Sequence, residues 1–146
     1  MEQAEGSILI EAPLEDVMEV IEDYEAYPEW AEVTSAVVRV RGDGGRPLEV
    51  SFEVDVPVLG KAGYTLAYVY ATGDTGLSWT AKETRGPIRD IRGEYLLNEL
   101  EDDTTKVTYR LGVELGPLVP GFLRAEGERR IIENALERLK RRVEMG

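Results

Sequence analysis

Residues 33–115 carry the pattern that most restricts the fold: six apolar stretches in unbroken succession, each ended by a turn signal. The clearest stretch is residues 48–56, where every second residue is apolar and the residues between them are Glu49, Ser51, Glu53 and Asp55. Alternation with a period of two is typical of a half-buried β-strand. Six such strands joined by short turns predict an antiparallel meander, whose apolar face another element must cover.

Glycine or acidic turn residues separate these predicted strands. The first turn, Gly42-Asp43-Gly44-Gly45, has the glycines of a phosphate-binding loop but lacks the lysine and the following helix of one. We therefore interpret it as a hairpin turn. The strands are residues 33–41, 48–56, 64–71, 77–84, 88–100 and 106–115.

The residues before the meander predict one further strand and two short helices. Residues 6–11 form a short apolar run that predicts the strand. Pro13 suits the first position of a helix over residues 13–23, because its missing N–H is not needed there. Pro28 and the aromatic residues beside it predict a separate helical turn over residues 27–30.

Residues 120–144 predict an amphipathic helix of about 25 residues, or on the order of 37 Å at 1.5 Å per residue. One face of this helix repeats at three- and four-residue steps, through Phe122, Ala125, Arg129, Ile132, Leu136, Leu139 and Val143. This is the only long amphipathic segment, so we expect it to cover the sheet. A strongly curled sheet is contacted only in part by one helix, and the remaining space is either filled by large side chains or left as a cavity.

Together these elements predict one α+β domain spanning residues 1–146. It consists of a seven-stranded curved antiparallel sheet wrapped around a long C-terminal helix, with two short helices between the first two strands.

Composition narrows the chemistry that this domain can carry. The chain has no histidine and no cysteine, which removes thiol nucleophiles, Ser-His pairs and almost every zinc site, so neither a metal nor a cofactor is expected. A net charge of −12 is the opposite of the basic footprint of a nucleic-acid binder. We expect a cytoplasmic protein with no signal peptide and no membrane span, and its Glu- and Arg-rich composition suits a thermostable one.

Four segments resemble the START/polyketide-cyclase-like superfamily (SRPBCC, Bet v 1-like), which also contains coenzyme-Q-binding proteins. They are Ile8-Leu9-Ile10-Glu11-Ala12-Pro13, Tyr27-Pro28-Glu29-Trp30, Gly93-Glu94-Tyr95-Leu96-Leu97 and Thr105-Lys106-Val107-Thr108-Tyr109. The resemblance covers nearly the whole chain. It implies the helix-grip fold, with an apolar cavity beneath the C-terminal helix, but it does not identify a ligand.

The candidate ligand-binding residues are large inward-facing side chains of the strands, together with residues of the last helix and of the segment before the second strand. Ordinary core packing is the alternative for each one, although several tyrosines facing one interior favour an amphipathic pocket. The inward face of residues 64–71 stays open, because both faces of this strand carry apolar residues. The candidates are Trp30, Phe52, Val54, Leu66, Tyr68, Trp79, Tyr95, Tyr109, Leu111, Phe122, Arg129 and Ile132.

Several charged residues, one glycine and one tyrosine have two interpretations each. Arg129 interrupts the apolar face of the last helix, and it either points at a polar group of the ligand or extends its guanidinium into water. Gly127 marks either a bend or close packing in that helix. Glu83 and Arg92 are either a polar pair at the interior or solvated charges on the strands. Tyr27 either lines a cavity entrance or belongs to the core.

Three functions are compatible with this sequence. The first is binding or carriage of a hydrophobic small molecule, such as a lipid, a quinone or a polyketide-like compound. The second is a polyketide cyclase, aromatase or dehydratase, which a hydrogen-bonded Tyr/Arg/Glu cluster facing the cavity would favour. The third is a protein-interaction module with a filled core and an exposed apolar patch at residues 57–59 or 118–119.

Overall fold

The computed structural model describes residues 3–56, 58–117, 119 and 121–146, and of residues 121–126 it describes the backbone. Seven strands within these residues form one antiparallel sheet in the order β1-β7-β6-β5-β4-β3-β2. The elements are β1 (Ala4–Ile10), α1 (Leu14–Glu22), η1 (Tyr24–Glu29), β2 (Ser35–Arg41), η2 (Asp43–Gly45), β3 (Pro47–Val56), β4 (Gly60–Tyr70), η3 (Thr72–Asp74), β5 (Gly76–Arg85), β6 (Ile88–Leu100), β7 (Thr104–Leu115) and α2 (Gly121–Met145).

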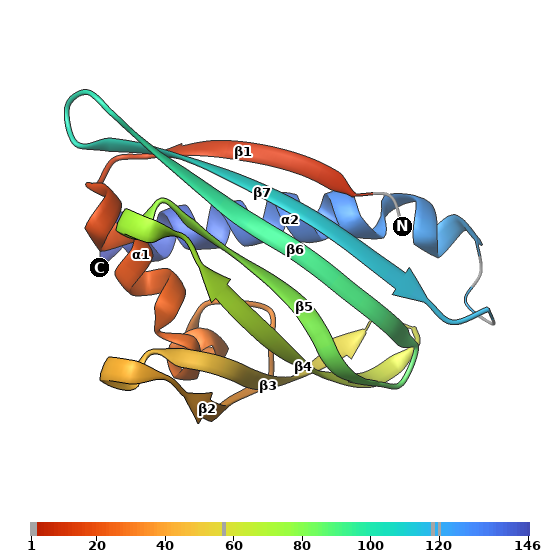
Figure 1. The fold of residues 1–146 in the computed structure, drawn as a ribbon. Helices are drawn as coiled ribbons and strands as arrows, with labels where there is room; N and C mark the ends of the chain where they lie inside the picture. The colour runs from red at the N-terminus through yellow and green to blue at the C-terminus, as the bar shows by residue number, and fades with distance from the viewer. Residues whose placement is uncertain (1–2, 57, 118, 120) are drawn as a thin grey trace.

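This architecture confirms the predicted helix-grip fold. The sheet curls around one side of α2, while α1 and η1 lie near one end, where the C-terminus of α2 also lies (Figure 1). β1 closes the order at one edge by pairing with β7, from Ala4 opposite Leu111 to Ile10 opposite Thr105. The first strand therefore joins the last one, and the six consecutive strands form the predicted meander.

Some predicted boundaries were wrong by a few residues. β4 begins at Gly60 rather than at residue 64, because its pairing with β3 already starts at Gly60, opposite Val56. β2 begins at Ser35 rather than at residue 33, although Thr34 already donates its N–H to the carbonyl of Glu53 at 2.8 Å. Pro13 precedes the first helical residue instead of occupying it, with an extended backbone.

The inward face of β4 is the one that carries Leu66 and Tyr68. Both residues are buried, whereas Val69 on the opposite face is 69% exposed. On the neighbouring strand β3, Val50 and Phe52 are buried on the same side. The apolar residues of β3 therefore face the interior, as the alternation predicts.

Helix α2 packs against β1, β7 and α1. The close approach to β1 depends on Gly6, where an added Cβ would lie 2.7 Å from Cγ2 of Ile132. Leu136 and Leu139 continue the buried face of α2. Because α2 packs on the β1–β7 side of the sheet, the surface of β3, β4 and β5 is left without a covering helix over much of its length.

Among the described residues, no helix is both long and apolar enough to cross a membrane.

Candidate ligand cavity

A cavity of about 840 Å³ lies between α2 and the inward face of strands β3 to β7. It occupies the space that α2 leaves by packing toward β1. Its wall is mostly aromatic and aliphatic. Its exposed charged lining residues, which mark where the cavity meets solvent and which we call its mouth, are Glu32, Asp55, Glu114, Arg130 and Arg138. Pockets for small molecules typically have volumes of roughly 300–1,000 Å³, so this cavity has the size of a ligand site.

Most of the predicted ligand-binding residues line this cavity. The structure brings together Trp30, Phe52, Val54, Leu66, Tyr68, Trp79, Tyr95, Tyr109 and Leu111. The side chain of Phe122 lies outside the described residues.

Two of the predicted residues do not belong to the cavity wall. Ile132 is buried, but it packs over Gly6 of β1. Arg129 is exposed and does not line the cavity. The apolar face of α2 that the sequence reveals is the face packed on β1, and the cavity is lined by the adjacent face of the helix. That face carries Gly127, Glu128, Arg130, Ile131, Asn134, Ala135 and Arg138.

The aromatic side chains form a continuous wall across the sheet. The ring centroids of Tyr68 and Trp79 are 6.0 Å apart, and those of Trp79 and Tyr95 are 5.3 Å apart. Tyr109 lies against both, with centroid distances of 5.7 Å to Trp79 and 4.7 Å to Tyr95. Tilted and edge-on contacts at these distances are favourable, so each ring restrains the position of its neighbours.

The tyrosine hydroxyls of the interior fall into two groups. Outside the cavity, Tyr70 donates to the carbonyl of Pro47 at 2.6 Å and lies 3.0 Å from the hydroxyl of Tyr24. Tyr27, which lines the cavity, donates to the carbonyl of Ile21 at 2.6 Å. These hydroxyls are satisfied within the protein.

The second group consists of the hydroxyls of Tyr64, Tyr68, Tyr95 and Tyr109. These four hydroxyls have no hydrogen-bond partner among the described residues. Within the same part of the chain, no fully buried side-chain oxygen or nitrogen lacks a partner. These hydroxyls must therefore border open space, and the space they border is the cavity. The cavity thus offers several hydroxyl groups to a ligand, set in an otherwise apolar wall.

Burial keeps these tyrosines protonated. It raises the pKa of Tyr64 to about 12, and it raises the pKa values of Tyr68, Tyr95 and Tyr109 well above the ordinary value of 10. Neighbouring tyrosines raise the pKa of Tyr68 and Tyr109 further, because two phenolates in one apolar space repel each other. At neutral pH these hydroxyls are therefore protonated and can donate hydrogen bonds.

Charged groups lie at the mouth of the cavity. Arg138 of α2 pairs with Glu32 at 3.3 Å, and its Nη1 donates to the carbonyl of Trp30 at 3.2 Å. At the other side, the backbone N–H of Val113 donates to the carboxylate of Glu128 at 2.7 Å. These contacts join α2 to residues 30–32 on one side of the mouth and to β7 on the other.

Two further charged residues that the sequence singled out lie outside the cavity wall. Glu83 and Arg92 are exposed, and Arg92 pairs with Asp90 at 3.4 Å, so they do not form a polar pair in the interior. In the two possible interaction patches, Val58 is 92% exposed, Leu59 lines the cavity and Val119 is buried. Residues 57 and 118 lie outside the described residues.

Sequence reasoning missed part of the wall. Leu77 and Ile91 line the cavity, and their place follows from the same alternation that identified Trp79 and Tyr95. Ile88 lines it too, but a register irregularity between Ile88 and Asp90 takes this residue off the alternation. Tyr64 also lines the cavity and is not among the candidates, although it alternates with Leu66 and Tyr68 on the same face of β4. The cavity face of α2 mixes polar, charged and small residues, so no periodic apolar signal marks it.

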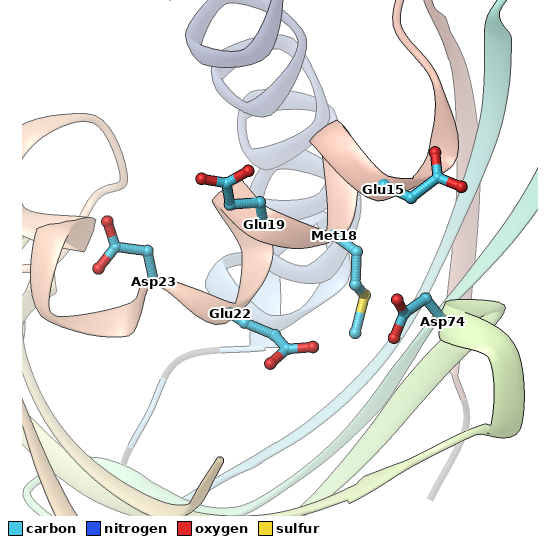
Figure 2. Close-up of a pocket in the computed structure, with 6 residues that line it drawn as sticks. All are labelled: Glu15, Met18, Glu19, Glu22, Asp23 and Asp74. Atoms are coloured by element: carbon cyan, nitrogen blue, oxygen red, sulfur yellow. The ribbon is translucent and has the colours of Figure 1, made fainter. Parts of the chain in front are cut away.

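A second, shallow hollow lies on α1, lined by Met18 and five carboxylates (Figure 2). Two of these carboxylates, Glu22 and Asp74, are bound by Arg46, whose Nη2 lies 3.2 Å from Oδ1 of Asp74. No group of three or more potential metal ligands is assembled within the described part of the chain. The larger cavity is therefore the candidate ligand site.

Comparisons with known proteins agree with this geometry. The family model described as polyketide cyclase / dehydrase and lipid transport matches residues 1–144. A START superfamily protein from Mycobacterium smegmatis superposes with a TM-score of 0.87 at 21% identity, covering 98% of this chain and 97% of that one. The Zhui aromatase/cyclase from Streptomyces sp. R1128 gives a TM-score of 0.83 at 18% identity, covering 98% and 93%.

A protein from Thermus thermophilus gives a TM-score of 0.78 at 23% identity, covering 97% of each chain. No curated protein sequence matches this chain. At these identities, the structural likeness establishes the fold and leaves the ligand to be inferred from the cavity itself.

Proposed function

The chain belongs to the polyketide cyclase/dehydrase and lipid transport family, and on that premise we propose that it binds one hydrophobic small molecule in the cavity between the sheet and α2. The single observation that carries the proposal is a mostly apolar cavity of about 840 Å³ into which four tyrosine hydroxyls open without a partner among the described residues. Burial of a ligand there contributes about 25 cal/mol for each Å² of apolar surface removed from water.

The hydroxyls narrow the class of ligand. An unpartnered donor in an apolar wall favours a ligand that brings an acceptor to it, because filling the cavity without one would leave the hydroxyl unsatisfied at a cost of about 1–3 kcal/mol. The ligand we propose is a ring compound carrying several oxygen atoms, of the quinone or polyketide type. A plain acyl chain would fit the apolar wall but would not pair with Tyr95 or Tyr109.

We favour binding over catalysis because the cavity tyrosines lack a proton-transfer partner among the described residues. The hydrogen-bonded tyrosine pair of the interior, Tyr24 and Tyr70, does not line the cavity. Among the described residues, none of the four unpartnered cavity tyrosines is hydrogen-bonded to an acid or a base that would move its proton. The third possibility, an interaction module with a filled core, is disfavoured by the open volume itself.

Aromatase/cyclase activity is the second candidate. It is favoured by the same hydroxyls, since neutral donors can orient the carbonyl groups of a flexible chain for ring closure. The structural similarity to the Zhui aromatase/cyclase supports the fold needed for such a reaction. Mass spectrometry after incubation with a poly-β-ketone would show a loss of water if the protein were such an enzyme.

The proposal is tested by calorimetric titration with a hydroxyanthraquinone and with methyl palmitate. We expect saturable one-to-one binding of the quinone and weaker binding of the ester. Ala135→Trp, which places an indole at the cavity wall, should abolish quinone binding. Glu133→Trp, at an exposed position of the same helix outside the cavity, should leave it unchanged.

Two results would contradict the proposal. One is the absence of saturable binding to the wild-type protein by either probe. The other is equal binding by the wild-type and Ala135→Trp proteins, because the bound probe would then lie outside the cavity.

A further inference from the structure

Trp79 lies directly against the backbone of Gly93. The two residues are paired across strands β5 and β6. A Cβ atom added at Gly93 would lie 2.5 Å from Cζ2 and 2.8 Å from Nε1 of the indole. Such distances are far inside van der Waals contact, so the indole occupies the space that any other residue at position 93 would fill.

Gly93 belongs to the row of β6 residues that faces the cavity. Its neighbours in that row, Ile91 and Tyr95, are buried and line the cavity. The backbone of Gly93 does not have a positive φ, so the turn-forming freedom of glycine does not account for the residue. What glycine supplies at this position is the absence of a side chain.

The neighbours of Trp79 restrict where the ring could move. Tyr68 is 6.0 Å away on one side, and Tyr95 and Tyr109 are 5.3 and 5.7 Å away on the other, measured between ring centroids. Displacement within the plane of the sheet would push these rings together. The open direction for the indole is toward α2, into the cavity.

We propose that Gly93 sets the depth of the cavity, and with it the size of the ligand, by letting Trp79 lie flat on the sheet. The inference rests on the proposed ligand-binding function. With a side chain at position 93, the indole stands away from the sheet and occupies part of the volume that a ligand would fill. Gly93 is therefore a size-determining residue that acts through Trp79.

The experiment compares two probes of different size, the two-ring menadione and a three-ring hydroxyanthraquinone, by calorimetric titration. In Gly93→Ala, we expect the affinity for the three-ring probe to fall tenfold or more, and that for the two-ring probe to change less than threefold. Adding Trp79→Leu should restore three-ring binding to the level of the Trp79→Leu protein, because the displaced ring is then gone.

Gly6→Ala is the matched control, since a Cβ there meets Ile132 outside the cavity wall. It should lower the melting temperature without changing the ratio of the two affinities.

The outcomes separate the two proposals. If the wild-type protein binds neither probe, the ligand-binding function fails. If the wild-type protein binds both and Gly93→Ala keeps the same ratio of affinities, the size-determining role of Gly93 is overturned while the function stands. If Gly93→Ala does not fold, the Gly93→Ala/Trp79→Leu protein decides, because recovery of folding and of three-ring binding supports the role and failure to recover refutes it.

Discussion

Arg138 and Glu32 form an ion pair on one side of the mouth of the cavity, with Nε of Arg138 3.3 Å from Oε1 of Glu32. The pair joins α2 to the segment that connects η1 to β2. One turn further along α2, Arg142 pairs with Glu29 at 3.1 Å. Since Trp30 and Glu32 both line the cavity, these contacts hold one wall of its mouth against the helix.

Loosening this wall should speed ligand exchange. Exposed ion pairs contribute about 0.2–1 kcal/mol, and Arg138 and Glu32 are 44% and 56% exposed. We therefore expect Arg138→Gln to raise the dissociation rate of a bound hydroxyanthraquinone by about two- to fivefold, as measured by stopped-flow displacement. High salt should speed dissociation from the wild-type protein more than from the variant. Arg141→Gln, at an exposed position on the same helix, is the control, and an equal effect there would refute the explanation.

The two groups of tyrosines should respond differently to loss of the hydroxyl. Tyr70→Phe removes a hydrogen bond to Pro47 and one to Tyr24, so we expect the free energy of unfolding to fall by about 1–2 kcal/mol. Tyr109→Phe removes a hydroxyl that has no partner among the described residues, and the stability of the free protein should stay within about 0.5 kcal/mol. Urea denaturation of both variants measures the difference.

The same Tyr109→Phe protein should bind an oxygen-bearing ring compound about two- to tenfold more weakly than the wild type, because one neutral hydrogen bond contributes about 0.5–1.5 kcal/mol. Calorimetric titration with a hydroxyanthraquinone checks this. An unchanged affinity for Tyr109→Phe would mean that this hydroxyl does not contact the ligand.

Stability should be lost at alkaline pH. Burial raises the pKa of Tyr64 to about 12 and raises the pKa values of Tyr68 and Tyr95 well above 10. Above pH 10 the unfolded chain releases these protons while the folded protein keeps them. The free energy of unfolding therefore has its full value below pH 10 and falls as the pH rises above 10. Each pKa unit of difference corresponds to about 1.4 kcal/mol per group.

Absorbance of phenolate, followed together with circular dichroism, tests this expectation. The buried tyrosines should ionise in one step with unfolding. Ionisation of all the tyrosines near pH 10 with no loss of structure would contradict it. Because the chain has no histidine and no cysteine, stability should vary little between pH 6 and 9.

Among the cations of the described surface, we expect Arg46 to be the one whose substitution lowers the stability of the protein most. Its Nε lies 3.2 Å from Oε2 of Glu22, its Nη2 lies 3.2 Å from Oδ1 of Asp74, and its Cζ lies 3.9 Å from the ring centroid of Tyr70. A lysine cannot make these contacts at once, because it lacks the planar guanidinium. We expect Arg46→Lys to cost about 1 kcal/mol in urea denaturation. Arg41→Lys, in an exposed pair with Glu25, should cost less than about 0.5 kcal/mol.

Much of the fold follows from patterns that the sequence displays directly. The alternation in β3 requires Phe52 and Val54 on one face, and both lie on the cavity side. The same rule places Trp79, Tyr95 and Tyr109 together, since each occupies an inward position of its own strand. These predictions succeed because strand geometry leaves one choice once an apolar face is defined.

What the sequence could not predict depends on how the elements meet. The strongest apolar face of α2 contains Ile132 and Leu136. Gly6 has no side chain, so that face of the helix can pack closely on β1. The cavity is consequently lined by the adjacent face of the helix, which includes Asn134 and Arg138 and has no apolar periodicity. For β4, apolar residues on both faces make the pattern symmetric, and only pairing with β3 and β5 decides the inward one. The volume of the cavity depends on how α2, the strands and their side chains pack together, and no sequence pattern predicts it.

The one-sided packing of α2 also determines how this protein should respond to hydrostatic pressure. Unfolding removes internal void space, so compression favours the unfolded chain in proportion to the voids that the folded state keeps. Only the part of the cavity of about 840 Å³ that its apolar wall keeps free of water contributes to this effect. Occupation of the cavity by a ligand fills that void, and the bound protein should consequently withstand pressures at which the free protein unfolds.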